Sequence, residues 1–352
     1  MKQFFLTGTY TEQVTATGKR SEGIYLCSLE NGRMEQLECI PMRNPSFLTV
    51  DEKRRHIYAV NELQSFQGVY GGGLTDIAYD EAGHFTIIGS YPTGGTDPCH
   101  VAVSPDGEFV CAANYSDGRV TAFRLDPDGR VNGEHRIFEL DGKGPNPQRQ
   151  EGPHAHCVLF GKDGEMAVND LGTDQIRAFR IEDGSISRAG EEDIRLTPGS
   201  GPRTGAWSRD GMHLYVTNEL NSTVTHLVRE NGKLKPEASV STLPEGETCE
   251  NYCSDLHLSP DGKTLYAANR GYDSIAIFRV AADGSLRIRG WTPSGGSWPR
   301  CFAIDPEGKW LVAACQNGGR VTAFAIGENG ELEQRGVLEM PFPVCVQFVG
   351  NG

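Results

Sequence analysis

Hydrophobic and polar positions along the chain alternate in short runs of strand length. Runs such as FVCAAN, TLYAAN and WLVAAC are apolar at most positions, and turn-forming Asp, Asn and Gly residues separate them from the next run. Glycine supplies the positive φ that tight turns between strands require, and the chain has 44 glycines. The pattern predicts an all-β protein made of antiparallel hairpins.

The runs recur in a longer repeat. The stretch DPCHVAVSPDGEFVCAANYSDGRVTAFRLDPDG over 97–129 resembles those over 253–284 and 298–330. Each holds an alternating strand, a turn of the PDG type, a second apolar strand, a polar tip and a third strand. Weaker copies begin near residues 44, 152 and 201, and a truncated seventh begins near residue 343. A period of roughly 45 to 55 residues is typical of four-stranded propeller blades.

The strands missing from the seventh copy are found at the other end of the chain, in FFLTGTY, GIYLCSL and MEQLECI. We therefore predict one seven-bladed β-propeller domain over 1–352, its ring closed by a blade that takes strands from both termini. Two stacked sandwiches would not explain a repeat divided between the termini. The polar segment over 141–156 is expected to be a loop rather than a domain linker.

Charge and composition narrow the class of function. The formal net charge is −14 and the pI is about 5.1, which disfavours nucleic-acid and anionic-membrane binding. The start, MKQFFLTGTY, lacks the features of a signal peptide, and the sequence has no long apolar run. We expect a cytoplasmic protein whose 10 cysteines are mostly reduced core residues.

Two sets of polar residues recur where propeller blades meet the central channel. Because the tips after the second strands are equivalent, they place these side chains together: Asn61, Glu62, Asn114, Tyr115, Asn169, Asp170, Asn218, Glu219, Asn269, Arg270 and Gln316. The starts of the first strands bring in His100, His154, His156, Arg203, Asp255 and Arg300. Each blade is therefore expected to contribute one or two groups to a shared pocket.

Many of these residues also have a structural explanation, since Asn and Asp cap strand ends with local hydrogen bonds. His156, Arg203, Glu219 and Arg270 differ from the residues at the same place in the other repeats. A structural role would recur more often, so these four are the predicted catalytic group. His154 shares a strand face with His156 and is the alternative histidine.

The chemistry of this group favours proton transfer next to an anion. A cation would be opposed by the two arginines, so no metal site is expected, nor any organic cofactor. No serine lies in a G-x-S-x-G elbow. Histidine and glutamate can exchange protons with water, and arginine binds phosphate, carboxylate or a developing oxyanion.

These residues resemble those of a known family. FLTGTYT, NPSFLTVD, GPHAHCVLF, DLGTDQI, VTNEL, LSPDGKTLYAANRG and PRCFAIDPEGKWLVAACQ are similar to the seven-bladed propeller lactonases, which include 6-phosphogluconolactonases and the carboxy-cis,cis-muconate cyclase. The likeness covers nearly the whole chain. One departure is Gly161-Lys162, where sister repeats have Ser-Pro.

The resemblance implies a catalytic group of His156 (or His154), Arg203, Glu219 and Arg270. It also implies hydrolysis of a small anionic sugar lactone, most simply 6-phosphogluconolactone in the pentose phosphate pathway, by a monomer or weak homodimer. The expected substrate-binding residues are His154, His100, Asn114, Tyr115, Asp170, Glu62, Asn218 and Arg300. A muconate-type cycloisomerase and a noncatalytic binding propeller remain alternatives, as does an exchange of acid and base roles between His156 and Glu219.

Overall fold

The computed structural model describes residues 2–81, 83–162 and 164–350 of the chain. Its regular structure is almost entirely antiparallel β-strand, from β1 to β31, with a single 3₁₀ turn at Gly190–Glu192 within the described part. This confirms the all-β prediction. The residues group into two compact units, Met1–Pro41 with Arg203–Asn351, and Met42–Pro202. Over the described residues, no helix has the length and apolar character needed to cross a membrane.

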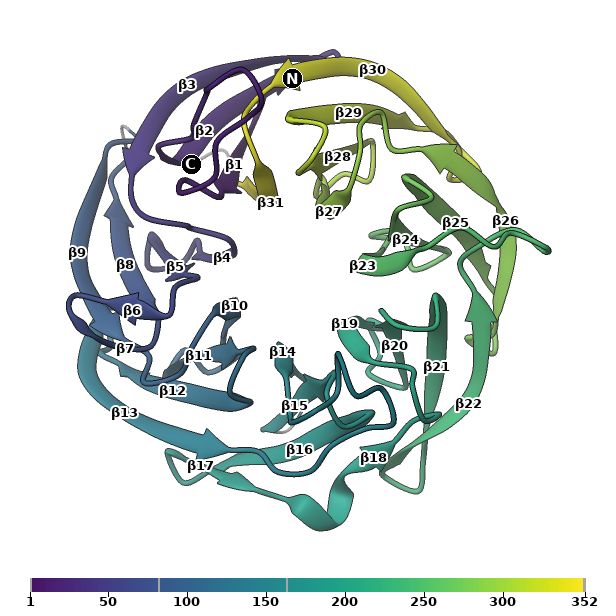
Figure 1. Ribbon diagram of the computed structural model, residues 1–352, viewed down its shortest axis with the longest axis horizontal. Coiled ribbons are helices and arrows are strands. Elements are labelled where there is room, and N and C mark those ends of the chain that lie inside the picture. Colours follow the sequence, from purple (N-terminus) through teal and green to yellow (C-terminus); the bar gives the residue numbers. More distant parts are fainter. Residues whose placement is uncertain (1, 82, 163, 351–352) are drawn as a thin grey trace. The chain divides into compact units, whose positions relative to one another are not determined.

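The first unit contains four blades, each an antiparallel sheet of four strands (Figure 1). The terminal blade has the order β3-β2-β1-β31 and consists of β1 (Gln3–Thr9), β2 (Gly23–Glu30), β3 (Arg33–Pro41) and β31 (Pro343–Val349). The other three are β19 (Pro202–Trp207), β20 (His213–Asn218), β21 (Thr223–Glu230), β22 (Lys233–Ser241); β23 (Tyr252–Leu258), β24 (Thr264–Arg270), β25 (Ser274–Val280), β26 (Leu286–Pro293); and β27 (Pro299–Ile304), β28 (Trp310–Cys315), β29 (Arg320–Ile326), β30 (Leu332–Glu339).

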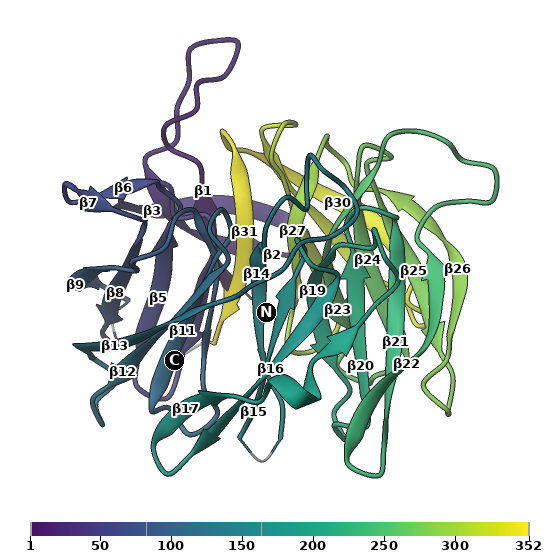
Figure 2. The ribbon, with the colours of Figure 1, turned by 60° about the horizontal axis from the view of Figure 1, so that its bottom comes forward.

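The terminal blade joins the two ends of the chain, as the truncated repeat predicted. Strand β1 pairs with β2 on one side and with β31 on the other, so that Phe5 lies opposite Phe348. Their rings pack 6.0 Å apart within a shared core cluster. The loop between β1 and β2 projects away from this blade (Figure 2).

The second unit contains three blades. They consist of β4 (Leu48–Asp51), β5 (His56–Asn61), β8 (Gly73–Tyr79), β9 (Phe85–Pro92); β10 (Pro98–Val103), β11 (Phe109–Asn114), β12 (Arg119–Leu125), β13 (Val131–Glu139); and β14 (Ala155–Phe160), β15 (Glu165–Asp170), β16 (Gln175–Glu182), β17 (Ser185–Arg188), with β18 (Ile194–Arg195) as a fifth strand. A small hairpin of β6 (Ser65–Phe66) and β7 (Val69–Tyr70) lies between β5 and β8 in sequence. The two units together hold the seven blades that the repeat predicted.

The repeated Ser-Pro-Asp-Gly turns explain why the first two strands of a blade form hairpins. In the β10 blade, Ser104 donates its hydroxyl hydrogen to Asp106 at 2.5 Å and accepts the amide of Phe109 at 3.0 Å. Gly107 has a φ of +70°, a conformation that a side chain would strain. The polar residues therefore satisfy the turn's own backbone, and the apolar strands on either side are set in register.

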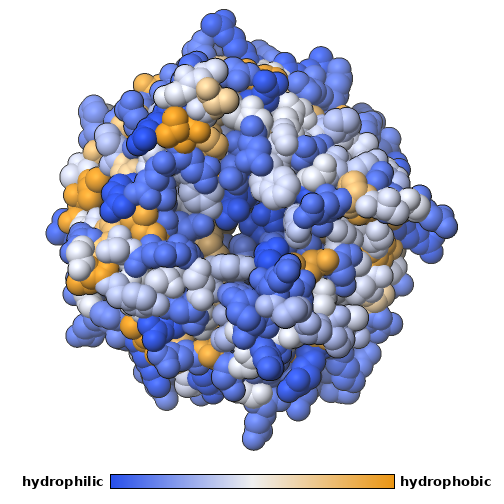
Figure 3. Space-filling model, viewed as in Figure 1, coloured by the Kyte–Doolittle hydropathy of each residue, from blue (hydrophilic) through white to orange (hydrophobic). Residues whose placement is uncertain are grey.

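The cysteines lie where the sequence placed them, since all 10 are unbridged thiols and most are buried. Cys249 is the exposed one. Buried apolar side chains such as Phe278 and Leu265 form the cores between sheets. The molecular face in Figure 3 is mostly hydrophilic, with apolar residues in small groups.

Candidate active site

A β-bulge at the start of the first strand presents the candidate site residues. The residue without a ladder partner is His156 in β14, Arg300 in β27 and Cys99 in β10. In β23, Ser254 and Asp255 together lie opposite a single residue of β24. A bulge re-aims a side chain out of the regular alternation of a strand. Bulges thus recur in both units, and His156, Arg300 and Asp255, which the sequence predicted as site residues, lie in them.

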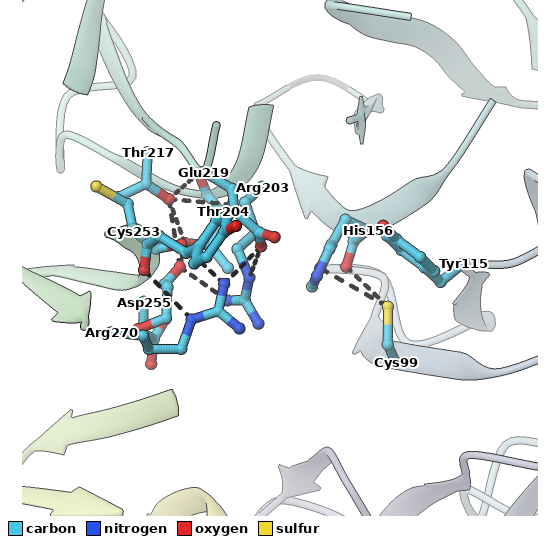
Figure 4. Close-up of polar contacts among 12 residues, drawn as sticks. Cys99, Tyr115, His156, Arg203, Thr204, Thr217, Glu219, Cys253, Asp255 and Arg270 are labelled. Carbon is cyan, nitrogen blue, oxygen red and sulfur yellow. Dashed lines mark hydrogen bonds and ion pairs between the residues drawn. The ribbon is translucent and has the colours of Figure 1, made fainter. Parts of the chain in front are cut away.

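In the first unit, two arginines converge on the carboxylate of Glu219 (Figure 4). Glu219 directly follows β20, Arg203 is the second residue of β19, and Arg270 ends β24. Glu219 Oε2 lies 3.0 Å from Arg203 Nε and 2.7 Å from Arg270 Nη2. All three residues are at most 5% exposed. The prediction that these three residues come together is confirmed within this unit.

Both guanidinium groups are anchored on backbone carbonyls. Arg203 Nη1 donates to the Ser254 carbonyl at 2.8 Å. Arg270 donates from Nε to the Tyr252 carbonyl and from Nη2 to the next carbonyl, each at 3.3 Å. The Nε–H of Arg203 is not directed along a hydrogen bond, so its contact with Glu219 is an ion pair by proximity alone. Arg203 is therefore held mainly by a backbone carbonyl, whereas Arg270 is held by the Glu219 carboxylate at 2.7 Å together with two longer backbone contacts.

The first-unit cluster has more positive than negative charge. Burial lowers the pKa of Arg270 to about 10; Glu219 opposes this shift, and Arg203 and Arg300 add to it. The guanidinium of Arg300 lies 5.4 Å from the centre of the Tyr10 ring. Two arginines thus contact one carboxylate, and a third acts electrostatically on Arg270, in a chain whose net charge is −14. Such a concentration of arginines favours an anionic ligand.

In the second unit, the structure distinguishes the two candidate histidines. His154 donates from Nδ1 to the Tyr115 carbonyl at 2.8 Å, and its Nε2 lies 3.3 Å from Glu151 Oε1. Its ring also stacks on the Tyr115 ring, with the centres 4.5 Å apart. Both nitrogens of His154 are therefore engaged, which favours a structural role.

His156 is held differently. Its Nδ1 lies 3.7 Å from Cys99 Sγ, and its ring meets the edge of Tyr115 at 5.5 Å between centres (Figure 4). The neighbouring thiol is a weak hydrogen-bonding partner, whereas His154 has a carbonyl and a carboxylate. His156 stays the predicted histidine of the reaction.

Three residues predicted to bind substrate make hydrogen bonds within their own blades, and their contacts with substrate stay predictions. Asn114 donates to the Arg119 carbonyl and to Thr121, both at 3.1 Å. Asn218 donates to Thr223 and Thr225, both at 2.8 Å. These amides hold the second strand of the blade to the third, the local role that Asn often has at strand ends.

Asp170 is the third of these residues. Its Oδ2 accepts Thr173 Oγ1 at 2.6 Å and Arg177 Nε at 3.0 Å, and its Oδ1 accepts the His154 amide at 2.8 Å. The side chain is fully buried. These contacts favour a structural role for Asp170.

His100, Glu62 and Tyr115 complete the predicted substrate-binding set of the second unit. His100 occupies a paired position beside the bulge, so it is not the equivalent of His156. It stacks on Phe47, with ring centres 4.3 Å apart, and its Nε2 lies 3.3 Å from Cys157 Sγ. This favours packing for His100. Substrate contacts of Glu62, Tyr115 and Arg300 stay predictions.

The sequence did not single out Ser254, because its part in the cluster runs through its backbone carbonyl. It also did not reveal the pair of Asp255 and His257. Burial alone would raise the pKa of Asp255, but His257, 3.1 Å away, and the Phe302 amide lower it to about 2. The described residues contain no group of three or more His, Cys, Asp or Glu placed to hold a metal ion.

Comparisons with known proteins identify the family of the chain. Residues 4–348 match the model of the family described as lactonase, 7-bladed beta-propeller. The chain belongs to the seven-bladed β-propeller lactonase family. It is therefore an enzyme of the lactonase class, and the predictions of fold class and family are confirmed.

Individual relatives cover nearly the whole chain. The chain is 31% identical to a 6-phosphogluconolactonase of Bacillus subtilis, over 97% of each chain. It is also 31% identical to a 6-phosphogluconolactonase of Formosa agariphila, over 93% of this chain and 94% of the relative. Among solved structures, the periplasmic gluconolactonase PpgL of Pseudomonas aeruginosa has a TM-score of 0.91 at 28% identity and covers 100% of both chains.

Proposed function

We propose that this lactonase hydrolyses 6-phosphogluconolactone to 6-phosphogluconate. The observation that carries the proposal is Glu219, buried and paired with Arg203 and Arg270 at 3.0 and 2.7 Å. A carboxylate can accept a proton from water, and arginines can stabilise both the substrate's anion and the oxyanion formed during ester hydrolysis. The names of the Bacillus subtilis and Formosa agariphila relatives support this choice of substrate.

The reaction needs one bond formed and one broken. The oxygen of a water molecule bonds to the lactone carbonyl carbon, and the carbonyl oxygen becomes an oxyanion. When the carbonyl reforms, the bond to the ring oxygen breaks, and the proton taken from water passes to that oxygen. We assign Arg203 and Arg270 to the oxyanion and to the substrate's negative charge, because their guanidinium groups are the cations that surround Glu219.

Glu219 is proposed to receive the water proton or to orient the group that does. Its carboxylate is held by cations that an anionic substrate also attracts, so substrate binding loosens the ion pairs and makes the carboxylate more basic. His156 is proposed as a further proton-transfer residue, since histidine changes charge near neutral pH. Each assignment is tested by its own variant, Glu219→Gln and His156→Gln.

The experiment compares two substrates with the purified enzyme. Freshly prepared 6-phosphogluconolactone and the unphosphorylated glucono-δ-lactone are supplied separately, and acid formation is followed with spontaneous opening subtracted. We expect hydrolysis of both lactones, with a higher kcat/KM for the phosphorylated one because the cluster contains three arginines. Hydrolysis of the unphosphorylated lactone alone would contradict the proposed substrate, and no hydrolysis of either would contradict the proposed function.

A further inference from the structure

Ser254 makes hydrogen bonds in two directions from the bulge of β23. Its carbonyl accepts Arg203 Nη1 at 2.8 Å and Thr204 Oγ1 at 2.9 Å, both from β19. Its hydroxyl donates to the Pro299 carbonyl, at the start of β27, at 2.6 Å. The residue is fully buried, so it cannot contact a substrate. One residue thus connects the strand that carries Arg203 to the strand that carries Arg300.

The two connections can be separated by mutation. The bond to Arg203 uses the backbone carbonyl and survives any change of side chain. The bond to Pro299 uses the hydroxyl and is lost when serine becomes alanine. Because Arg300 directly follows Pro299 and is the bulged residue of β27, the hydroxyl acts on the position of Arg300 and leaves the hold on Arg203 unchanged.

Arg300 differs from the other two arginines of the cluster. Arg203 and Arg270 lie within 3.0 Å of Glu219, whereas the guanidinium of Arg300 lies over the Tyr10 ring at 5.4 Å. It is nevertheless close enough to Arg270 to help lower the pKa of that residue. Arg300 is thus a cation beside the group assigned to the developing oxyanion, suited to a phosphate that the lactone carries away from its reacting carbonyl.

We propose that Ser254 is a positioning residue that sets the place of Arg300 and thereby the preference for lactones carrying a phosphate group. This inference rests on the proposed function. Removing the hydroxyl releases the start of β27, so Arg300 spends less time where the phosphate binds. The reaction at the carbonyl depends on Glu219, Arg203 and Arg270 and continues.

The test is the ratio of kcat/KM for 6-phosphogluconolactone to kcat/KM for glucono-δ-lactone. This ratio does not change when part of the enzyme is merely unfolded, because both substrates report on the same active molecules. Ser254→Ala is expected to lower the ratio about tenfold, as for a weakened hydrogen bond to a charged group. The kcat for glucono-δ-lactone is expected to stay within about twofold of wild type.

Ser294→Ala is the matched control. Ser294 is also fully buried, and its hydroxyl lies 2.9 and 2.6 Å from the carbonyls of Asp273 and Gly296. Its loss is expected to destabilise the protein similarly and to leave the ratio unchanged. Should Ser254→Ala fail to fold, Ser254→Cys keeps a weaker donor and is expected to give a ratio between wild type and Arg300→Met.

A double-mutant cycle with Arg300→Met decides whether Ser254 acts through Arg300. Arg300→Met alone is expected to lower the ratio at least as much as Ser254→Ala, and adding Ser254→Ala is expected to lower it no further. A ratio that Ser254→Ala leaves at the wild-type value would overturn the positioning role while the lactonase function stands. An additive effect of the two substitutions would also overturn it, and a wild type without activity on either lactone would overturn the proposed function itself.

Discussion

Asp170 and Glu219 are buried carboxylates where the second strands of two blades end, yet their positions and surroundings differ. Asp170 is the last residue of β15 and pairs with Gln175, as Asn218 pairs with Thr223, whereas Glu219 is the residue after Asn218. Asp170 is held by Thr173, by Arg177 at 2.9 Å and by a backbone amide, all within its own blade. Glu219 is paired with Arg203 from its own blade and with Arg270 from the next one. In the structure both are shielded from water.

The comparison teaches that burial beside arginine does not identify a reactive carboxylate. Burial raises the pKa of Asp170, while Thr173 and Arg177 oppose that shift. Arg177 and the hydroxyl of Thr173 both contact the carboxylate of Asp170, so the carboxylate holds its own strand to the turn and strand that follow. The Glu219 cluster instead has an excess of arginines anchored on carbonyls, so it keeps positive charge for an incoming anion.

The largest expected effect comes from changing one arginine in each cluster. Arg270→Lys keeps the charge but loses the planar contact with Glu219 and with the Tyr252 carbonyl. We expect kcat/KM for the lactone to fall by about 10³-fold, as when an oxyanion-stabilising group is removed. Arg177→Lys, the matched change beside Asp170, is expected to leave kcat/KM within about threefold once corrected for folded protein. Equal losses of rate would remove the distinction between the clusters.

The next effect is on stability. Asp170→Asn removes the charge that pairs with buried Arg177, and breaking a buried ion pair costs about 3 kcal/mol of unfolding free energy. Urea unfolding measures this loss. Asp141→Asn is the control, because Asp141 lies 3.8 Å from the same arginine but its side chain is 97% exposed. A control loss as large as that of Asp170→Asn would contradict the structural assignment.

A second pair of equivalent sites extends the comparison to pH. His56 lies 2.6 Å from Asp76 in one blade, whereas His213 lies 3.0 Å from His226 in another. Burial, and next the neighbouring histidine, lower the pKa of His226 in the folded protein. The folded state therefore binds this proton more weakly than the unfolded state, and stability is lost as pH falls from about 6.5 through the lowered pKa.

His226→Asp would give His213 an aspartate neighbour, as His56 has in Asp76. We expect wild type to lose on the order of 1 kcal/mol between pH 7 and pH 5 through this pair, and the variant to lose less. Thermal unfolding at the two pH values is the measurement, with His226→Asn as the uncharged control. A variant with the same acid-dependent loss as wild type would show that the pair does not govern it.

The smallest effect concerns the pH dependence of stability that the pair of His257 and Asp255 causes. Burial would lower the pKa of His257, but Asp255, 3.1 Å away, raises it. Because the folded pKa is raised, the pair's contribution is present below about pH 6.5 and is lost as pH rises through the folded pKa. His257 is 42% exposed in its side chain, so the change is a few tenths of a kcal/mol. His257→Gln should remove this slope in unfolding experiments between pH 6 and pH 8, and a slope that persists would assign it elsewhere.

The blades could be predicted from the sequence because the repeat, the apolar runs and the turn residues agree with one another. The shared terminal blade followed from counting strands. The meeting of Arg203, Glu219 and Arg270 also followed, since Glu219 and Arg270 lie at equivalent ends of second strands and Arg203 lies at the start of a first strand.

The sequence pattern groups Asp170 with Glu219, because both lie in the polar tip after a second strand. The ladders show that Asp170 corresponds to Asn218, one residue before Glu219. The two carboxylates also differ in the arginines that contact them, and these contacts come from the folded structure. The sequence pattern also groups His100 with His156, because both lie at the start of a first strand. The shared bulge makes Cys99 the equivalent of His156 and places His100 one position later. The role of Ser254 escaped prediction since its carbonyl, and not its residue type, holds Arg203.

The central claim is that Glu219 takes part in lactone hydrolysis and Asp170 does not. The direct measurement places Glu219→Gln and Asp170→Asn side by side and records both kcat for 6-phosphogluconolactone and the free energy of unfolding. We predict that Glu219→Gln lowers kcat by about 10²-fold or more while remaining folded, and that Asp170→Asn loses stability while its folded fraction keeps nearly the wild-type kcat. A folded Glu219→Gln enzyme with wild-type kcat, or an Asp170→Asn enzyme with normal stability and no activity, would contradict the account.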